Sequence, residues 1–86
     1  MRHIIGILRP FDLEQTFYVC EGDNQIECIH STIESLSNDI FMLVDKYKIN
    51  EIKLTGSKQY TLKIKQDLEQ DALLKYNQNI LNIECL

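Results

Sequence analysis

The sequence predicts a small α/β domain of two layers, in which a five-stranded mixed sheet carries two helices on one face. Three observations predict this fold class. A nearly continuous apolar run near the N-terminus is followed by two segments rich in aromatic and β-branched residues. Two longer segments have apolar residues at helical spacing, and a short strand-like segment follows each of them. The predicted element order is therefore βββαβαβ.

The composition indicates one globular domain that spans residues 1–86. The chain is 44% apolar and 26% charged, and its net charge of −4 weighs against non-specific binding to nucleic acid or to an anionic membrane. No apolar run approaches the roughly 20 residues of a membrane span, and the N-terminus lacks the features of a signal peptide. We therefore expect a cytoplasmic protein. Cys20, Cys28 and Cys85 fall in predicted strands, where we expect small buried residues in a reducing compartment.

The first three predicted strands follow one another as antiparallel neighbours. His3–Arg9 is apolar without alternation, as in a central strand that is contacted on both faces, and Pro10 ends it. Thr16–Glu21 and Gln25–His30 are the second and third strands. The residues Gly22-Asp23 form a two-residue loop between them, in which glycine supplies the positive φ of a type II′ turn.

This loop fixes a predicted pairing register for the hairpin. The pairs are Val19 with Ile26, Phe17 with Cys28, Tyr18 with Glu27, and Cys20 with Gln25. One face of the hairpin is then apolar and the other is mixed polar, as expected for a half-buried hairpin. Cys20 and Cys28 point to opposite faces in this register, so we expect no disulfide between them.

Two helices and two further strands complete the chain. Ser31 and Glu34 have the spacing of a capping box and predict a helix over Thr32–Lys48. Glu51–Thr55 is a short alternating strand. Ser57 is the predicted N-cap of a helix that runs to Tyr76, and Ile80–Cys85 is the last strand. The apolar positions of the first helix are Ile33, Leu36, Ile40, Leu43, Val44 and Tyr47.

The simplest sheet order is 3-2-1-4-5, with the second strand antiparallel to the others. Both helical crossovers should be right-handed, which places both helices on one face. In this topology the chain resembles the ribonuclease H-like fold, which the actin-like ATPases elaborate. The segment Leu54-Thr55-Gly56-Ser57 is similar to the strand-glycine-helix turn of actin-like domains. The chain also resembles small uncharacterised phage proteins of Gram-positive hosts.

Helices on one face leave the other face of the sheet uncovered. The residues that we expect there, as a possible interface, are Tyr18, Cys20, Glu27, Lys53, Asn82 and Glu84. Because the first strand is apolar on both sides, this face should have an apolar centre with a polar rim. Such a surface is typical of an interaction site. The alternative is a solvated face on which long side chains cover the centre.

The resemblance to ribonuclease H-like nucleases implies clustered carboxylates that would hold two metal ions for phosphoryl transfer. The family has one carboxylate in the middle of the first strand, where this chain has Ile4-Ile5-Gly6-Ile7-Leu8, and another near the end of the fourth strand, where it has Leu54-Thr55. The chain lacks both, so we expect no catalytic residues. Cys28 and His30 share a strand face without any zinc-ligand spacing, so we expect neither a metal nor a cofactor.

The leading hypothesis is a non-catalytic interaction module that docks a protein partner or a second copy through the open sheet face or an edge strand. Phage accessory or host-directed inhibitory roles are implied by the resemblance alone. The alternative is a module that binds nucleotide or nucleic acid. In that case the residues Thr55, Gly56, Ser57 and Lys58, at a helix N-terminus, would hold a phosphate.

Overall fold

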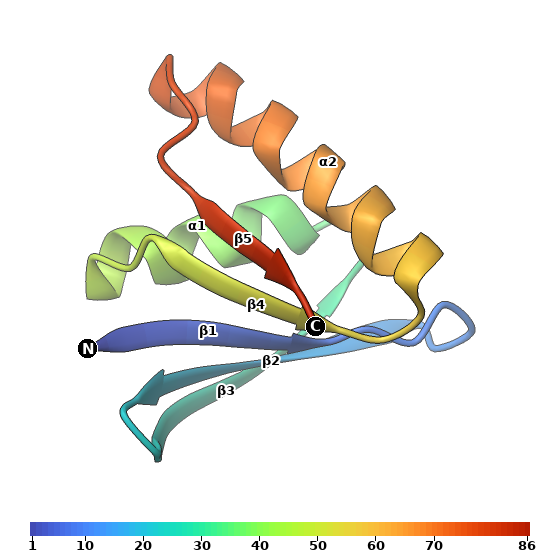
Figure 1. The fold of residues 1–86 in the computed structure, drawn as a ribbon, viewed down its shortest axis with the longest axis horizontal. Helices are drawn as coiled ribbons and strands as arrows, with labels where there is room; N and C mark the ends of the chain where they lie inside the picture. The colour runs from blue at the N-terminus through green and yellow to red at the C-terminus, as the bar shows by residue number, and fades with distance from the viewer.

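The computed structural model describes residues 1–86, and it contains the seven predicted elements in the predicted order. They are β1 (Arg2–Ile7), β2 (Glu14–Glu21), β3 (Asn24–Thr32), α1 (Leu36–Tyr47), β4 (Glu51–Thr55), α2 (Lys58–Tyr76) and β5 (Asn82–Cys85). The sheet order is β3-β2-β1-β4-β5, as predicted (Figure 1). β2 is antiparallel to β1 and β3, whereas β4 is parallel to β1 and β5.

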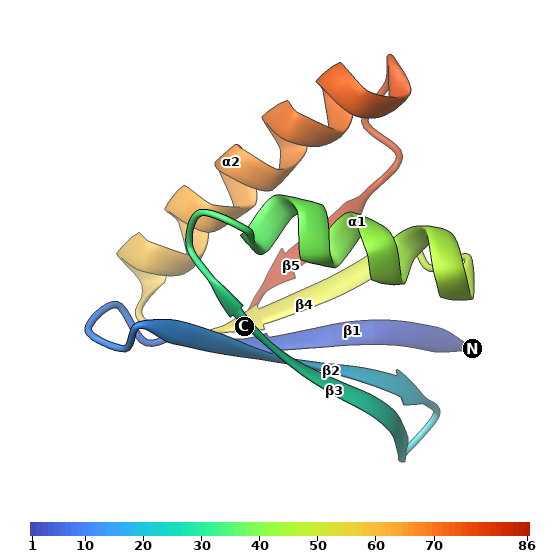
Figure 2. The same cartoon turned by 180° about the vertical axis from the view of Figure 1, so that it is seen from behind.

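Both helices lie on one face of the sheet, which confirms the two-layer arrangement. Figures 1 and 2 show α1 and α2 on the same side of the strands, seen from the front and from behind. Alternate residues of β1, β2 and β4, such as Ile4, Phe17 and Ile52, point into this layer and are fully buried. Neither helix is both long and apolar enough to pass through a membrane.

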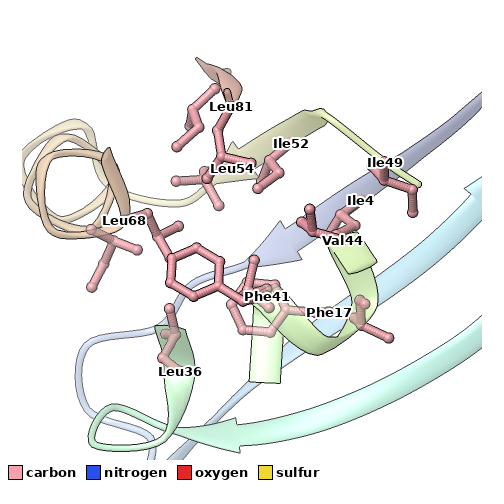
Figure 3. Close-up of a cluster of buried hydrophobic side chains, with 14 of the residues drawn as sticks. Ile4, Phe17, Leu36, Phe41, Val44, Ile49, Ile52, Leu54, Leu68 and Leu81 are labelled. Atoms are coloured by element: carbon pink, nitrogen blue, oxygen red, sulfur yellow. The ribbon is translucent and has the colours of Figure 1, made fainter. Parts of the chain in front are cut away.

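The hydrophobic core fills the space between the helices and the sheet. Figure 3 shows side chains from every layer meeting there, with Phe41 of α1 and Leu68 of α2 close to Leu54 of β4. Gly6 of β1 makes room for Phe17, because a Cβ at position 6 would come within 2.6 Å of the Phe17 ring. The core therefore depends on a missing side chain in the central strand.

The ends of β1 and β2 differ from the prediction for one reason. β1 stops at Ile7 rather than Arg9, and β2 begins at Glu14 rather than Thr16. The side chain of Gln15 is buried, accepts a hydrogen bond from the backbone N–H of Arg9 and donates one to its carbonyl. Gln15 thus takes the place of a strand partner for Arg9. The last strand starts at Asn82, two residues later than predicted.

The capping box predicted at Ser31 and Glu34 does not form, so the predicted start of the first helix is wrong. β3 continues through Thr32, and α1 begins only at Leu36, with Ser35 as its N-cap residue. Ser31 instead pairs with Gln15 in the sheet, and its hydroxyl donates a 2.7 Å hydrogen bond to Asp39. The longer ladder with β2 therefore prevails over the local helix signal. Ile33, predicted as a core residue, lies outside the helix and is 47% exposed.

The predicted hairpin register holds next to the turn and then fails at a β-bulge. Cys20 pairs with Gln25 as expected, and Gly22 has the positive φ of a type II′ turn, at 59°. Ile26 then has no partner, so every later pair is shifted by one residue. The observed pairs are Val19 with Glu27, Tyr18 with Cys28, and Phe17 with Ile29.

Candidate functional site: the open face of the sheet

Side chains that point away from the helices form one surface, which we call the open face. Strand pairing places its members in rows that run across the sheet. The open face comprises His3, Ile5 and Ile7 of β1, Glu14, Thr16, Tyr18 and Cys20 of β2, Gln25, Cys28, His30 and Thr32 of β3, Glu51, Lys53 and Thr55 of β4, and Asn82 and Glu84 of β5. Five of the six residues predicted from the sequence are among them.

The centre of the open face is apolar. Ile5 and Ile7 of the central strand are half-buried, although no helix covers them. Tyr18 lies beside Ile5 on one side, and Lys53 lies beside it on the other. Thr16 and Thr55 flank Ile7 in the same way. The long side chains of Tyr18 and Lys53 thus border an apolar strip and cover part of it.

Glu27, the sixth residue predicted on the open face, is instead on the helix side of the sheet. Its carboxylate accepts hydrogen bonds from the hydroxyl of Tyr47 and, at 3.0 Å, from the ammonium group of Lys46. These two hydrogen bonds lower the pKa of Glu27, with the Tyr47 bond contributing most. The physical reason for the error is the bulge at Ile26, because a shift of one residue reverses the direction of every later side chain.

Cys28 takes the place of Glu27 on the open face. It pairs with Tyr18 and is exposed, contrary to the expectation of a buried residue opposite Phe17. Cys20 is buried and lies on the same face, so the prediction that the two cysteines face opposite ways is also wrong. Cys20, Cys28 and Cys85 are all free thiols. No local sequence signal marks Ile26 as a bulge residue, so the exposed thiol could not be predicted.

Polar side chains on both faces of the sheet have hydrogen-bond partners. The hydroxyl of Thr16 lies 3.2 Å from Nδ1 of His30 on the open face. Asp39 accepts hydrogen bonds from Ser31 and Ser35 on the helix side. No three side chains of His, Cys, Asp or Glu lie close enough together to hold a metal ion.

Two further acidic residues lie in the connection between β1 and β2 and at the start of β2. Asp12 and Glu14 line a pocket of about 220 Å³ together with Arg9, Thr16 and Tyr18. The pocket borders the open face through Thr16 and Tyr18, so its charged groups extend the polar rim of that face.

The predicted phosphate site is a tight turn between β4 and α2. Gly56 has a φ of 150°, and a Cβ at this position would lie 2.6 Å from the carbonyl oxygen of Leu8. Ser57 is the N-cap of α2, and its side chain accepts a hydrogen bond from the backbone N–H of Tyr60 at 3.3 Å. Close packing thus explains the glycine, and helix capping explains the serine.

A pocket of about 580 Å³ lies beside this turn. Gly56, Lys58 and Lys65 line it, together with the C-terminal strand up to Leu86. Thr55 points to the open face and does not line this pocket. The four residues of the predicted phosphate site are therefore not brought together around one cavity.

A groove of about 630 Å³ lies between α1 and α2. Phe41, Ile64, Asp67 and Asp71 are among the residues that line it. Ser37 of α1 donates a hydrogen bond to Asp71 of α2, so one polar contact already joins the two walls. The groove is thus part of the packing between the helices.

Comparisons with protein-family models, with curated proteins and with solved structures found no match for this chain. The ribonuclease H-like relationship and the resemblance to phage proteins therefore stay predictions.

Proposed function

We propose that this protein is a non-catalytic interaction module that docks a protein partner through the open face. The observation that carries the proposal is the apolar strip of Ile5 and Ile7, which no helix covers. An antiparallel sheet tolerates a solvated face when that face is polar, but an uncovered apolar centre gains free energy when a partner removes it from water. Tyr18 at the edge of the strip adds the kind of aromatic side chain that interfaces favour.

The open face is a better docking surface than either edge of the sheet. β3 is a long edge strand, yet the bulge at Ile26 interrupts the regular row of backbone groups that a pairing strand would need. β5, at the other edge, has only four residues. Docking by strand addition therefore receives less support from the geometry than docking on the face.

The central strand supports a non-catalytic role. Residues without a carboxylate, Ile4–Leu8 and Leu54-Thr55, occupy the positions where the resemblance implies metal-binding carboxylates. Asp39 accepts hydrogen bonds from two serines. We place the interaction in the cytoplasm, since three free thiols fit a reducing compartment. A phage accessory or host-directed inhibitory role fits a small module of this kind, and it rests on the resemblance alone.

The experiment compares the proteins that immobilised variants capture from a lysate of the source organism. Tyr18→Ala and Lys53→Glu alter the open face, whereas Lys48→Glu makes the same charge change at the C-terminal end of α1. The proposal expects wild type and Lys48→Glu to capture one shared set of proteins. The two open-face variants should lose that set. Equal capture by all four proteins would contradict the proposal.

A second candidate function, phosphate or nucleotide binding, has one observation in its favour. Lys58 and Lys65 both line the pocket beside Gly56. Amide NMR spectra recorded during titration with ATP, and separately with a short oligonucleotide, test this candidate. Shifts that cluster at Gly56 and Lys58 would favour it over docking on the open face, and unchanged spectra would eliminate it.

A further inference from the structure

We infer that the open face docks a second copy of this chain, and that the two-fold axis of the pair runs along β1. The inference rests on the proposed function, because it names the partner of the same surface. The evidence for it is the order of the side chains in one row across the sheet, compared with the order of the same row in the second copy.

The middle row of the open face is ordered by strand pairing. Ile5 is at its centre, with Tyr18 and then Cys28 on one side, and with Lys53 and then Glu84 on the other. The row therefore has an aromatic ring one strand from its centre and a positive charge one strand from its centre in the opposite direction. At its two ends are a thiol and a carboxylate.

Two sheets that pack face to face can be related by a two-fold axis along the strands or by one across them. An axis across the strands that passes through this row places each of its residues opposite its own copy, so Lys53 would face Lys53 and Glu84 would face Glu84. Like charges placed opposite one another in an interface are unfavourable. This axis is therefore disfavoured by the charges of the row.

An axis along β1 reverses the row. Tyr18 then faces Lys53 of the second copy, twice in each pair, and Cys28 faces Glu84 of the second copy. An ammonium group over a tyrosine ring is an attractive contact. Ile5 and Ile7 lie on the axis and meet their own copies, so the apolar strips cover one another. Aligned sheets cross at about 30°, which displaces neighbouring strands by less than one residue and keeps Tyr18 within reach of Lys53.

The area of the open face indicates how tightly two copies can associate. With the axis along β1, β5 lies over β3, β4 lies over β2 and β1 lies over its own copy, so the shorter strand limits the overlap to four, five or six residues. At a strand spacing of about 4.8 Å this overlap gives about 400 Å² in each copy, or about 800 Å² in total. Specific interfaces below about 1,200 Å² are weak or transient. We therefore expect a dissociation constant on the order of 10–100 μM rather than a permanent dimer.

The test is sedimentation equilibrium from about 5 μM to 1 mM, a range chosen to bracket that constant. The variants are Lys53→Glu, Tyr18→Lys and the double variant that carries both changes. With the axis along β1, each single change loses the Tyr18–Lys53 contact, and Tyr18→Lys also places two lysines opposite one another. The dissociation constant should rise at least tenfold in each case.

The double variant restores an attractive contact if the axis is correct. Its new lysine at position 18 lies opposite the new glutamate at position 53 of the second copy, so the two introduced charges have opposite signs. Association should therefore return to within about threefold of wild type. If the double variant associates more weakly than either single variant, the axis lies across the strands and the inference is overturned. It is also overturned if wild type is monomeric at about 1 mM, the upper end of the concentration range.

Lys48→Glu is the matched control, because it makes the same charge change at the exposed C-terminal end of α1 and should leave association unchanged. Circular dichroism and a thermal melt for every variant establish that a loss of association is not a loss of folding. A loss of association by Lys48→Glu equal to that of Lys53→Glu would overturn the inference, because the effect would then come from net charge and not from the open face.

Failure of this inference can be told apart from failure of the proposed function. Suppose that wild type is monomeric but still captures a different protein, and that Tyr18→Ala does not capture it. This result overturns the second copy as the partner and keeps the open face as the docking site. A monomeric wild type whose captured proteins are unaffected by Tyr18→Ala and Lys53→Glu overturns both.

Discussion

The hydroxyl of Tyr47, in the last turn of α1, donates a hydrogen bond to the carboxylate of Glu27 on the edge strand β3. Lys46 donates to the same carboxylate oxygen at 3.0 Å. β3 has a strand neighbour on one side only, so these contacts give it a second attachment to the rest of the molecule. The position of Glu27 depends on the bulge at Ile26, which turns its side chain toward the helix.

We predict that Glu27→Gln is less stable than wild type at pH 7 and that the difference disappears in acid. The hydrogen bonds from Tyr47 and Lys46 hold the pKa of Glu27 below its ordinary value of 4.5. A carboxylate whose pKa is lowered by folding stabilises the protein above its unfolded pKa, and this stabilisation is lost as the pH falls through its folded pKa. The difference should therefore shrink as the pH is lowered below 4.5.

Urea denaturation midpoints at a series of pH values between neutrality and acid check this prediction. Glu84→Gln on β5 removes a carboxylate for which no ion pair is present, and it is the control for a general change in net charge. A Glu27→Gln difference that stays constant across the series would show that the Tyr47 and Lys46 contacts do not contribute through the charge of Glu27.

The phenol of Tyr76 should ionise at a higher pH than its ordinary pKa of 10.0. Its burial, reinforced by a 2.9 Å hydrogen bond to Asp45, raises the pKa of the phenol to about 12. A group whose pKa is raised by folding contributes stability that is present below its unfolded pKa of 10.0 and is lost as the pH rises toward about 12. An ultraviolet titration of phenolate absorbance should show one component near pH 12, and Tyr76→Phe should remove it. Tyr18→Phe, on the open face, should leave that component in place.

Gly56 should tolerate substitution far less well than Gly22. Gly56→Ala would place a Cβ 2.6 Å from the carbonyl oxygen of Leu8 in a backbone conformation that side chains avoid. We expect a loss of about 3 kcal/mol in the free energy of unfolding. Gly22 has a φ of 59° but open space around it, so Gly22→Ala should cost only about 1 kcal/mol. Equal losses for the two variants, measured by urea denaturation, would contradict the close packing at Leu8.

The sheet order could be predicted from the sequence because general rules constrain it strongly. Short hairpins make β1, β2 and β3 neighbours, and right-handed crossovers place β4 and β5 on the other side of β1. The helix face of β4 followed from alternation, since Ile52 and Leu54 are fully buried. These features are set by many residues at once, so one exception does not change them.

Features that depend on competition between two local structures could not be predicted. Ser31 and Glu34 have the spacing of a helix cap, but pairing with Gln15 keeps Ser31 in the sheet. The bulge at Ile26 is a similar case. It brings Ile29 rather than a cysteine opposite Phe17, and isoleucine is the larger apolar side chain to pack against the core. That gain depends on tertiary packing, which the hairpin sequence alone does not contain.

Two single-residue deletions in β3 should distinguish the observed register, which has the bulge at Ile26, from the register predicted without a bulge. Deleting Ile26 removes the unpaired residue and leaves Glu27 opposite Val19, so the contact with Tyr47 should persist. We expect the free energy of unfolding to change by about 1 kcal/mol or less. Deleting Ile29 also removes the bulge, but every residue from Ile26 to Cys28 then shifts by one position. Glu27 turns to the open face, and Cys28 turns to the core.

Thiol labelling with a maleimide, followed by peptide mass mapping, distinguishes the two outcomes. Cys28 is exposed in wild type and should label rapidly there and after deletion of Ile26. After deletion of Ile29 it should be protected, because it then lies under α1. Cys20 is buried in the native fold and serves as the internal reference for unfolding. Rapid labelling of Cys28 in both deletions would mean that the strand does not slide as a unit, and that its register is fixed by contacts beyond the bulge.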